Sequence, residues 1–150
     1  MHWFQRNAWW ALVGFAALST VVGLMDLRAG APDNGLAVAG MTNDQLAALN
    51  GHAYALMQDQ IREGAIQLIA LSVLAGAILL YAFRRGQRWS WWALCALPTF
   101  AASEALLHLI DTSAGQKPPV EVFTGSIAAV VVAAILLVSA SRFFRPTPGQ

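Results

Sequence analysis

Four long apolar stretches limit what this chain can fold into: Ala8–Met25, Gly64–Phe83, Trp91–Ile110 and Val122–Ala140. A bilayer core about 30 Å thick is crossed by a helix of about 20 residues. Soluble domains carry about 25% charged residues, whereas this chain carries 11%. The sequence therefore predicts a single all-α membrane domain over residues 1–150, built as a bundle of four transmembrane helices.

The first apolar stretch has an alternative interpretation as a cleaved secretory signal. Arg6 precedes it, and the small residues Ala29, Gly30 and Ala31 follow it, as at a signal cleavage site. The stretch is 18 residues long, whereas the apolar core of a signal spans about 7–15. Its length favours a retained transmembrane helix over cleavage.

Basic residues are distributed unequally between the two sides of the predicted bundle. Six arginines lie at the N-terminus, in the turn after residue 83 and at the C-terminus: Arg6, Arg84, Arg85, Arg88, Arg142 and Arg145. The other connecting segments hold only Arg28, Arg62 and Lys117. All six tryptophans fall at the arginine-rich boundary, as an anchoring aromatic belt does. We therefore expect both termini on the cytoplasmic side of the membrane.

The outer loop, residues 27–60, is the one sizeable segment outside the predicted spans. Thr42 and Gln45 have the spacing of a capping box, which predicts a short outer-surface helix over Asn43–Leu49. The pair Asn50-Gly51 should end that helix.

The helical pattern that leads into the second span is longer than the bilayer needs. It runs without proline from His52 to Phe83, which is about 48 Å of helix. Its first turns must stand above the membrane or bend onto its surface, with Gly64 as the candidate bend.

All eight acidic residues lie on the predicted outer half, and Glu104 lies deepest. A carboxylate inside a span costs about 2.5–3.5 kcal/mol on insertion scales and normally faces a bundle interior or a wet cavity. His108 and Asp111 follow at four and seven residues, so the three share one helix face.

Each of the other spans also brings polar side chains to this outer end. These residues are Asp26, Glu63, Gln67 and Glu121. We expect an outward-opening acidic pocket in which Glu104 donates a proton, Glu63 is the second carboxylate and His108 orients Glu104. Asp26, Gln67, Asp111 and Glu121 would bind the ligand. Alternatively, Glu104 and His108 satisfy each other across one helical turn and only fix helix packing.

Several classes of chemistry are disfavoured by what the sequence lacks. A net charge of +1 gives no support for nucleic-acid binding. Cys95 is the single cysteine, which excludes an internal disulfide and a CxxC pair. Glu104 and His108 have usable metal-ligand spacing, but no Glu-x-x-His motif occurs, and His108 is the only histidine inside a span. We expect no metal and no cofactor.

Two features bear on how the spans pack. Pro98 lies inside the third span and should kink it. Gly125, Ala129 and Ala133 follow at four-residue intervals and predict a small-residue packing face, against another span or another copy of the chain.

The segments GMTNDQLAALN, IREGA and FRRGQRWSWWAL resemble a type of small four-span bacterial membrane protein of unknown function, over residues 40–110. That resemblance implies the four-span fold and a location in the bacterial inner membrane, and it implies no activity. In architecture the chain is also similar to the emopamil-binding sterol isomerases, which keep carboxylates inside a lipid-binding cavity; none of that family's motif residues carries over. The Arg-x-x-x-Asn-x-x-Glu pattern of the membrane glutathione-transferase-like proteins is missing, which argues against them.

The sequence thus favours a membrane protein that binds an apolar lipid- or terpenoid-like small molecule, with isomerase or cyclase chemistry by acid–base catalysis. The alternative is a non-enzymatic accessory subunit that packs against a membrane-protein partner, or a homo-oligomer.

Overall fold

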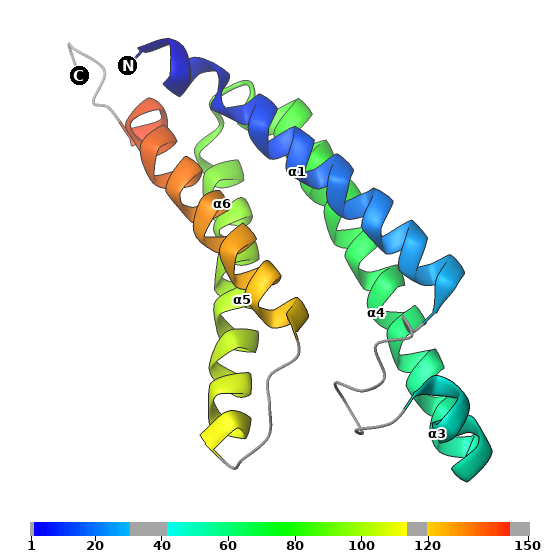
Figure 1. Ribbon diagram of the computed structural model, residues 1–150. Coiled ribbons are helices and arrows are strands. Elements are labelled where there is room, and N and C mark those ends of the chain that lie inside the picture. The colour runs from blue at the N-terminus through cyan, green and yellow to red at the C-terminus, as the bar shows by residue number, and fades with distance from the viewer. Residues whose placement is uncertain (1, 31–41, 114–119, 145–150) are drawn as a thin grey trace, which may run out of the picture. The chain divides into compact units, whose positions relative to one another are not determined.

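The computed structural model describes residues 2–30, 42–113 and 120–144, and nearly all of them are helical. Its elements, shown in Figure 1, are α1 (His2–Ala29), α3 (Asn43–Leu49), α4 (Gly51–Ile78), the π-helical turn η1 (Leu79–Phe83), α5 (Arg88–Ser113) and α6 (Val120–Phe144). No strand occurs within the described ranges. The prediction of an all-α chain is confirmed.

Three helical stretches are long and apolar enough to cross a membrane: Asn7–Ala29, Gly51–Phe83 and Gly125–Phe144. They contain or overlap the first, second and fourth predicted spans. The third predicted span lies inside α5, where several side chains fall outside the described part of the structure. Three apolar helices indicate an integral membrane protein, whereas a bundle of four spans is not confirmed.

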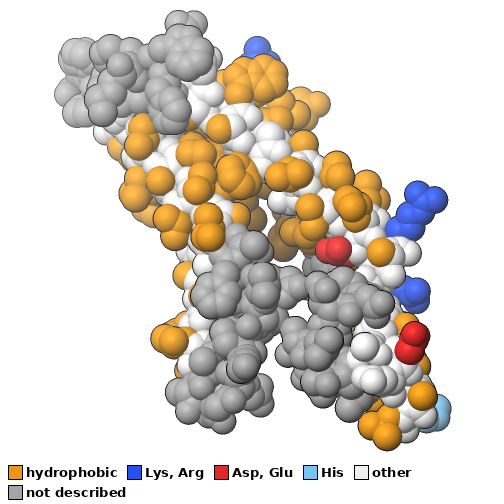
Figure 2. Space-filling model, in the orientation of Figure 1, with side chains coloured by type: hydrophobic (Ala, Val, Ile, Leu, Met, Phe, Trp, Pro, Cys, Tyr) orange, Lys and Arg blue, Asp and Glu red, His pale blue; other side chains and the backbone are white. Residues whose placement is uncertain are grey.

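Large apolar side chains remain exposed along these helices. Leu18 on α1, Leu74 on α4 and Leu137 on α6 each leave more than half of their surface uncovered. Figure 2 shows hydrophobic side chains covering much of the visible face. Exposed apolar surface of this extent is unfavourable in water, and lipid acyl chains would cover it.

The C-terminal end of α1 is set by a glycine and a close contact. Gly30 has a φ of 70°, a conformation that favours glycine, and its N–H donates a 2.8 Å hydrogen bond to the carbonyl of Asp26. The Gln58 amide on α4 occupies the place that a Cβ at position 30 would take. A larger residue would therefore disturb both the cap and this contact.

Local capping confirms the short helix α3, whose bounds are those predicted. The Thr42 N–H donates to Gln45 Oε1 at 2.9 Å, and the Gln45 N–H donates to Thr42 Oγ1 at 3.3 Å, which completes the capping box. Asn50 then ends α3 and caps α4, because its Oδ1 accepts from the N–H groups of His52 and Ala53 at 3.1 Å. From there α4 is continuous through Gly64.

The chain divides into two compact units, Ala16–Leu74 and the remainder. In the Ala16–Leu74 unit, α1 packs against α4 at a glycine. A Cβ on Gly23 would lie 3.1 Å from the carbonyl oxygen of Ala65 and 2.8 Å from Cγ1 of Ile69. Because Gly23 has no side chain, the two helix backbones approach closely, as small residues allow in membranes.

A hydrogen bond between two hydroxyl groups joins the same pair of helices. Thr20 Oγ1 on α1 lies 2.8 Å from Ser72 Oγ on α4, and Ser72 is buried. Each hydroxyl also bonds a carbonyl of its own helix, Ala16 for Thr20 and Ile69 for Ser72. Such bonds between helices contribute about 0.6 kcal/mol on average inside membranes.

The other unit contains residues 1–15 and 75–150, and in it α5 packs against α6 (Figure 1). Its most deeply buried apolar side chains are those of Leu79, Phe83 and Leu136. The rings of Phe83 and Phe143 are 4.7 Å apart. Through this contact, η1 at the end of α4 packs against the last turn of α6.

The packing predictions for the third and fourth spans have different outcomes. α5 is one continuous helix that contains Pro98. The proline therefore does not interrupt the helix, and the predicted kink stays a prediction. On α6, Ala129 and Ala133 are half-buried, but a Cβ on Gly125 would meet no described atom within 4 Å. The tight glycine contact between helices lies at Gly23 instead.

Candidate functional site

The three ionisable residues at the centre of the predicted pocket all lie on α5. Glu104, His108 and Asp111 fall within its 26 residues, which are helical throughout. Their separations of four and seven residues therefore place them on one face of the helix. Their side chains lie outside the described part of the structure, and the pocket itself stays a prediction.

The remaining predicted site residues are divided between the two units. Glu121 lies in the first turn of α6, in the same unit as Glu104, and its side chain is not described. Asp26 on α1 is half-buried, while Glu63 and Gln67 on α4 are exposed, and all three belong to the Ala16–Leu74 unit. Their participation in one pocket with Glu104 stays a prediction.

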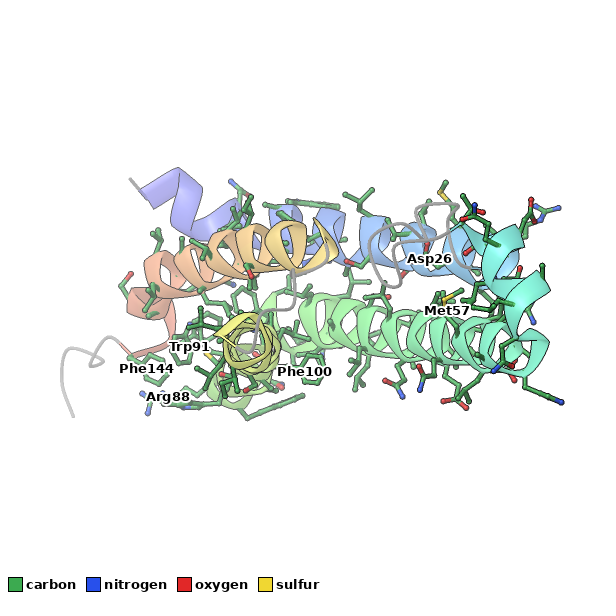
Figure 3. The ribbon with its side chains drawn as sticks, turned by 60° about the horizontal axis from the view of Figure 1, so that its bottom comes forward. Asp26, Met57, Arg88, Trp91, Phe100 and Phe144 are labelled. Atoms are coloured by element: carbon green, nitrogen blue, oxygen red, sulfur yellow. The ribbon has the colours of Figure 1, made fainter. Side chains whose placement is uncertain are left out.

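The described end of the Ala16–Leu74 unit has a polar character of its own. Figure 3 shows Asp26 on α1 and Met57 at the neighbouring part of α4. Gln58 donates from Nε2 to the Tyr54 hydroxyl at 3.0 Å, and the Gln58 amide lies beside Gly30 at the end of α1. Gln58 thus brings a polar side chain of α4 to the end of α1, whereas the predicted acidic pocket stays a prediction.

No group of three or more His, Cys, Asp or Glu side chains gathers within the described residues. Cys95 on α5 is half-buried and carries a free thiol. Glu104 and His108, the pair with usable ligand spacing, have undescribed side chains, so the absence of a metal site stays a prediction.

The polar cluster that the structure describes best lies where η1, α5 and α6 meet the first part of α1. We name it the arginine–tryptophan end and define it by Trp9, Arg84, Arg85, Arg88, Trp89, Trp92 and Arg142. Figure 3 shows Arg88 close to Trp91 and Phe144 in this region. The cluster forms within one unit and brings together residues up to 133 positions apart in the sequence.

The arginines of this cluster are held by aromatic rings and by helix termini. The guanidinium carbon of Arg84 lies 5.5 Å from the ring centre of Trp9, a cation–π contact. Arg142 Nη2 donates to the carbonyl of Arg84, and Arg88 Nε donates to the carbonyl of Phe143 at 3.0 Å. The last carbonyls of a helix lack partners within it and carry partial negative charge, which explains why guanidinium groups bind there.

The turn that presents these arginines depends on η1 and on one glycine. The Arg84 N–H donates to the carbonyl of Leu79, the five-residue step of a π-helix, at 3.0 Å. Gly86 follows with a φ of 75°, which favours glycine. This conformation reverses the chain within four residues and places Arg88 at the start of α5.

The aromatic residues next to the arginines fix α5 against α6. Trp91 Nε1 donates to the carbonyl of Leu136 at 2.8 Å, and the Trp91 and Phe144 rings meet edge to face at 5.2 Å. Trp89 and Trp92 are exposed beside them. From the sequence, these arginines and tryptophans were predicted to mark the cytoplasmic side and to anchor the helices in the membrane. Their crowding in the run FRRGQRWSWW indicated that they would lie close together. The contacts that they make with other helices were not predictable from that run.

No protein-family model, curated protein or solved structure matches the chain. The resemblance to small four-span bacterial proteins and the similarity in architecture to sterol isomerases therefore remain expectations from the sequence.

Proposed function

We propose that this integral membrane protein spans the bilayer four times, with α5 as the third span and both termini in the cytoplasm of a bacterium. We further propose that it binds an apolar lipid- or terpenoid-like molecule against the face of α5 that carries Glu104. In support, α5 has 26 residues, which is about 39 Å of helix and more than a bilayer core requires.

The observation that carries this proposal is the uninterrupted helix through Glu104, His108 and Asp111. Burying a carboxylate within a span costs about 2.5–3.5 kcal/mol on insertion scales. A hydrogen bond between transmembrane helices returns only about 0.6 kcal/mol on average and about 1.7 at most. Packing alone does not offset the cost of Glu104, which favours a role in binding.

Proton transfer is the chemistry that such a face offers to an apolar molecule. A protonated Glu104 would add its proton to a carbon–carbon double bond, and a base would remove a proton from a neighbouring carbon. The result is isomerisation, or cyclisation where a second double bond attacks the cation, with no other reactant consumed. His108 would orient Glu104, one helical turn away. Glu63 remains the predicted second carboxylate.

The test is native mass spectrometry of the purified full-length chain, comparing Glu104→Gln with the wild type. Asp59→Asn is the matched control, because Asp59 is an exposed carboxylate on α4. We expect an apolar small molecule to accompany the wild type and the control and to be lost from Glu104→Gln. Equal retention by all three forms would show that Glu104 does not hold the ligand.

Accessory-subunit function is the competing proposal, with a membrane-protein partner or a second copy as the binding partner. It receives support from the same experiment if every form carries no small molecule and is recovered bound to other subunits. In that case Glu104→Gln should lower stability or have no effect, and ligand binding should be abandoned.

A further inference from the structure

The arginine–tryptophan end carries positive charge without compensating carboxylates. The sequence contains no Asp or Glu before residue 26, between residues 64 and 103, or after residue 121. Arg84, Arg85 and Arg88 are exposed, and none forms an ion pair with a described residue. No described carboxylate therefore competes for these arginines with an anion from outside the chain.

Two arginines of the cluster, Arg84 and Arg88, are held in place by contacts within the chain. Arg88 uses its Nε–H on the Phe143 carbonyl, which leaves four further N–H groups on its guanidinium. Arg84 is placed over Trp9 by the cation–π contact. Guanidinium groups bind phosphate oxygens in a bidentate manner, and side chains already held in place lose less entropy when they do so.

The tryptophans give the depth of these arginines in a bilayer. Trp89 and Trp92 in the cluster and Trp10 next to Trp9 are each more than half exposed. Exposed indoles of membrane proteins sit at the level of the lipid headgroups. The neighbouring guanidinium groups then lie at the level of the lipid phosphates. The apolar surfaces of α5 and α6 continue from this end, where lipid acyl chains would cover them.

We infer that the arginine–tryptophan end is a binding surface for anionic phospholipids, with Arg85 and Arg88 as the main ligands of the headgroup phosphate. Phosphatidylglycerol fits this surface better than phosphatidylcholine, because the choline ammonium would face uncompensated arginines. This inference is independent of the proposed ligand site on α5, since it depends only on the membrane setting and on residues at the opposite end of that helix.

Intrinsic tryptophan fluorescence can report on lipid binding at this surface, because all six tryptophans lie within residues 3–10 and 89–92, the segments that form the arginine–tryptophan end or adjoin it. The full-length protein is reconstituted in phosphatidylcholine vesicles that contain brominated phosphatidylglycerol or, at the same fraction, brominated phosphatidylcholine. Bromine quenches tryptophan fluorescence on contact, so excess quenching by the phosphatidylglycerol measures its enrichment. We expect this excess in the wild type, and equal quenching by the two lipids would overturn the inference.

The variant Arg85→Gln/Arg88→Gln should lose the excess while all the tryptophans remain. The matched control is Arg28→Gln/Arg62→Gln, which removes two exposed arginines from the other unit. We expect relative affinity for phosphatidylglycerol to fall about fivefold for each arginine removed at the cluster, which corresponds to about 1 kcal/mol. An equal loss of excess quenching in the control would show that the enrichment of phosphatidylglycerol depends on net charge alone, and it would overturn the proposed binding surface.

A salt titration of the wild type keeps the inference testable if the double variant does not fold. Because the guanidinium groups are exposed, raising the salt from 0.01 M to 1 M shortens the screening length from about 30 Å to about 3 Å and should reduce the excess quenching. An excess that does not change with salt would contradict binding through the headgroup charge.

Discussion

The indole N–H of Trp91 on α5 donates a 2.8 Å hydrogen bond to the main-chain carbonyl of Leu136 on α6. The same carbonyl accepts the Ser139 hydroxyl at 2.8 Å. All three residues are buried. One carbonyl thus links two helices and sets the position of one helix along the other, next to the arginine–tryptophan end.

Replacing Trp91 with Phe should lower the free energy of unfolding by about 1–3 kcal/mol. The lost hydrogen bond accounts for about 1 kcal/mol, and the smaller ring leaves a cavity at this buried position that adds to the loss. The Leu136 carbonyl keeps its bond from Ser139, so it is not left without a partner. Detergent-induced unfolding followed by circular dichroism measures the loss. Trp89→Phe is the control, because Trp89 is exposed, and its effect should stay within about 0.5 kcal/mol. Equal effects of the two changes would contradict a specific role for Trp91.

Replacing Gly23 with Ala should destabilise the α1–α4 pair by about 1–3 kcal/mol, the range for overpacking. The new Cβ would lie 3.1 Å from a backbone oxygen, which cannot move without shifting α4. Gly14→Ala on the same helix is the control, since a Cβ there meets nothing within 4 Å. It should be neutral or stabilising by up to about 1 kcal/mol, because alanine favours helix. Thermal unfolding of both variants tests this, and a stable Gly23→Ala would show that the helices do not pack at this glycine.

Replacing Asn50 with Ala should cost about 1 kcal/mol, because the N-cap of α4 is lost. The amides of His52 and Ala53, which bond Asn50 Oδ1, should exchange hydrogen faster. Thr42→Ala makes the matched comparison, since it removes the capping box of α3 and should speed exchange at Gln45 instead. Unchanged protection of residues 52 and 53 in Asn50→Ala would show that water replaces the cap without loss.

Part of the candidate site was predictable, because it depends only on residue spacing within one helix. Helical spacing places Glu104, His108 and Asp111 on one face as soon as the segment is helical, and α5 meets that condition. Which side chains from other helices approach them depends on packing between distant segments, and a single sequence does not encode it in any local pattern. The same limit applies to the arginines. Their positions in the sequence predicted which side of the membrane they face, but not the contacts of Arg84 with Trp9 and of Arg88 with the Phe143 carbonyl.

The sequence by itself determined the all-helical class, three helical stretches long and apolar enough to cross a membrane, and the bounds of α3. Each follows from apolar length or from hydrogen bonds within a few residues. Only the tertiary structure decided that η1 continues α4, that Gly23 rather than Gly125 is the tight glycine contact, and that Trp91 bonds Leu136. These depend on the shapes of side chains brought together from distant parts of the chain, since apolar helices without such specific contacts could pair in many ways.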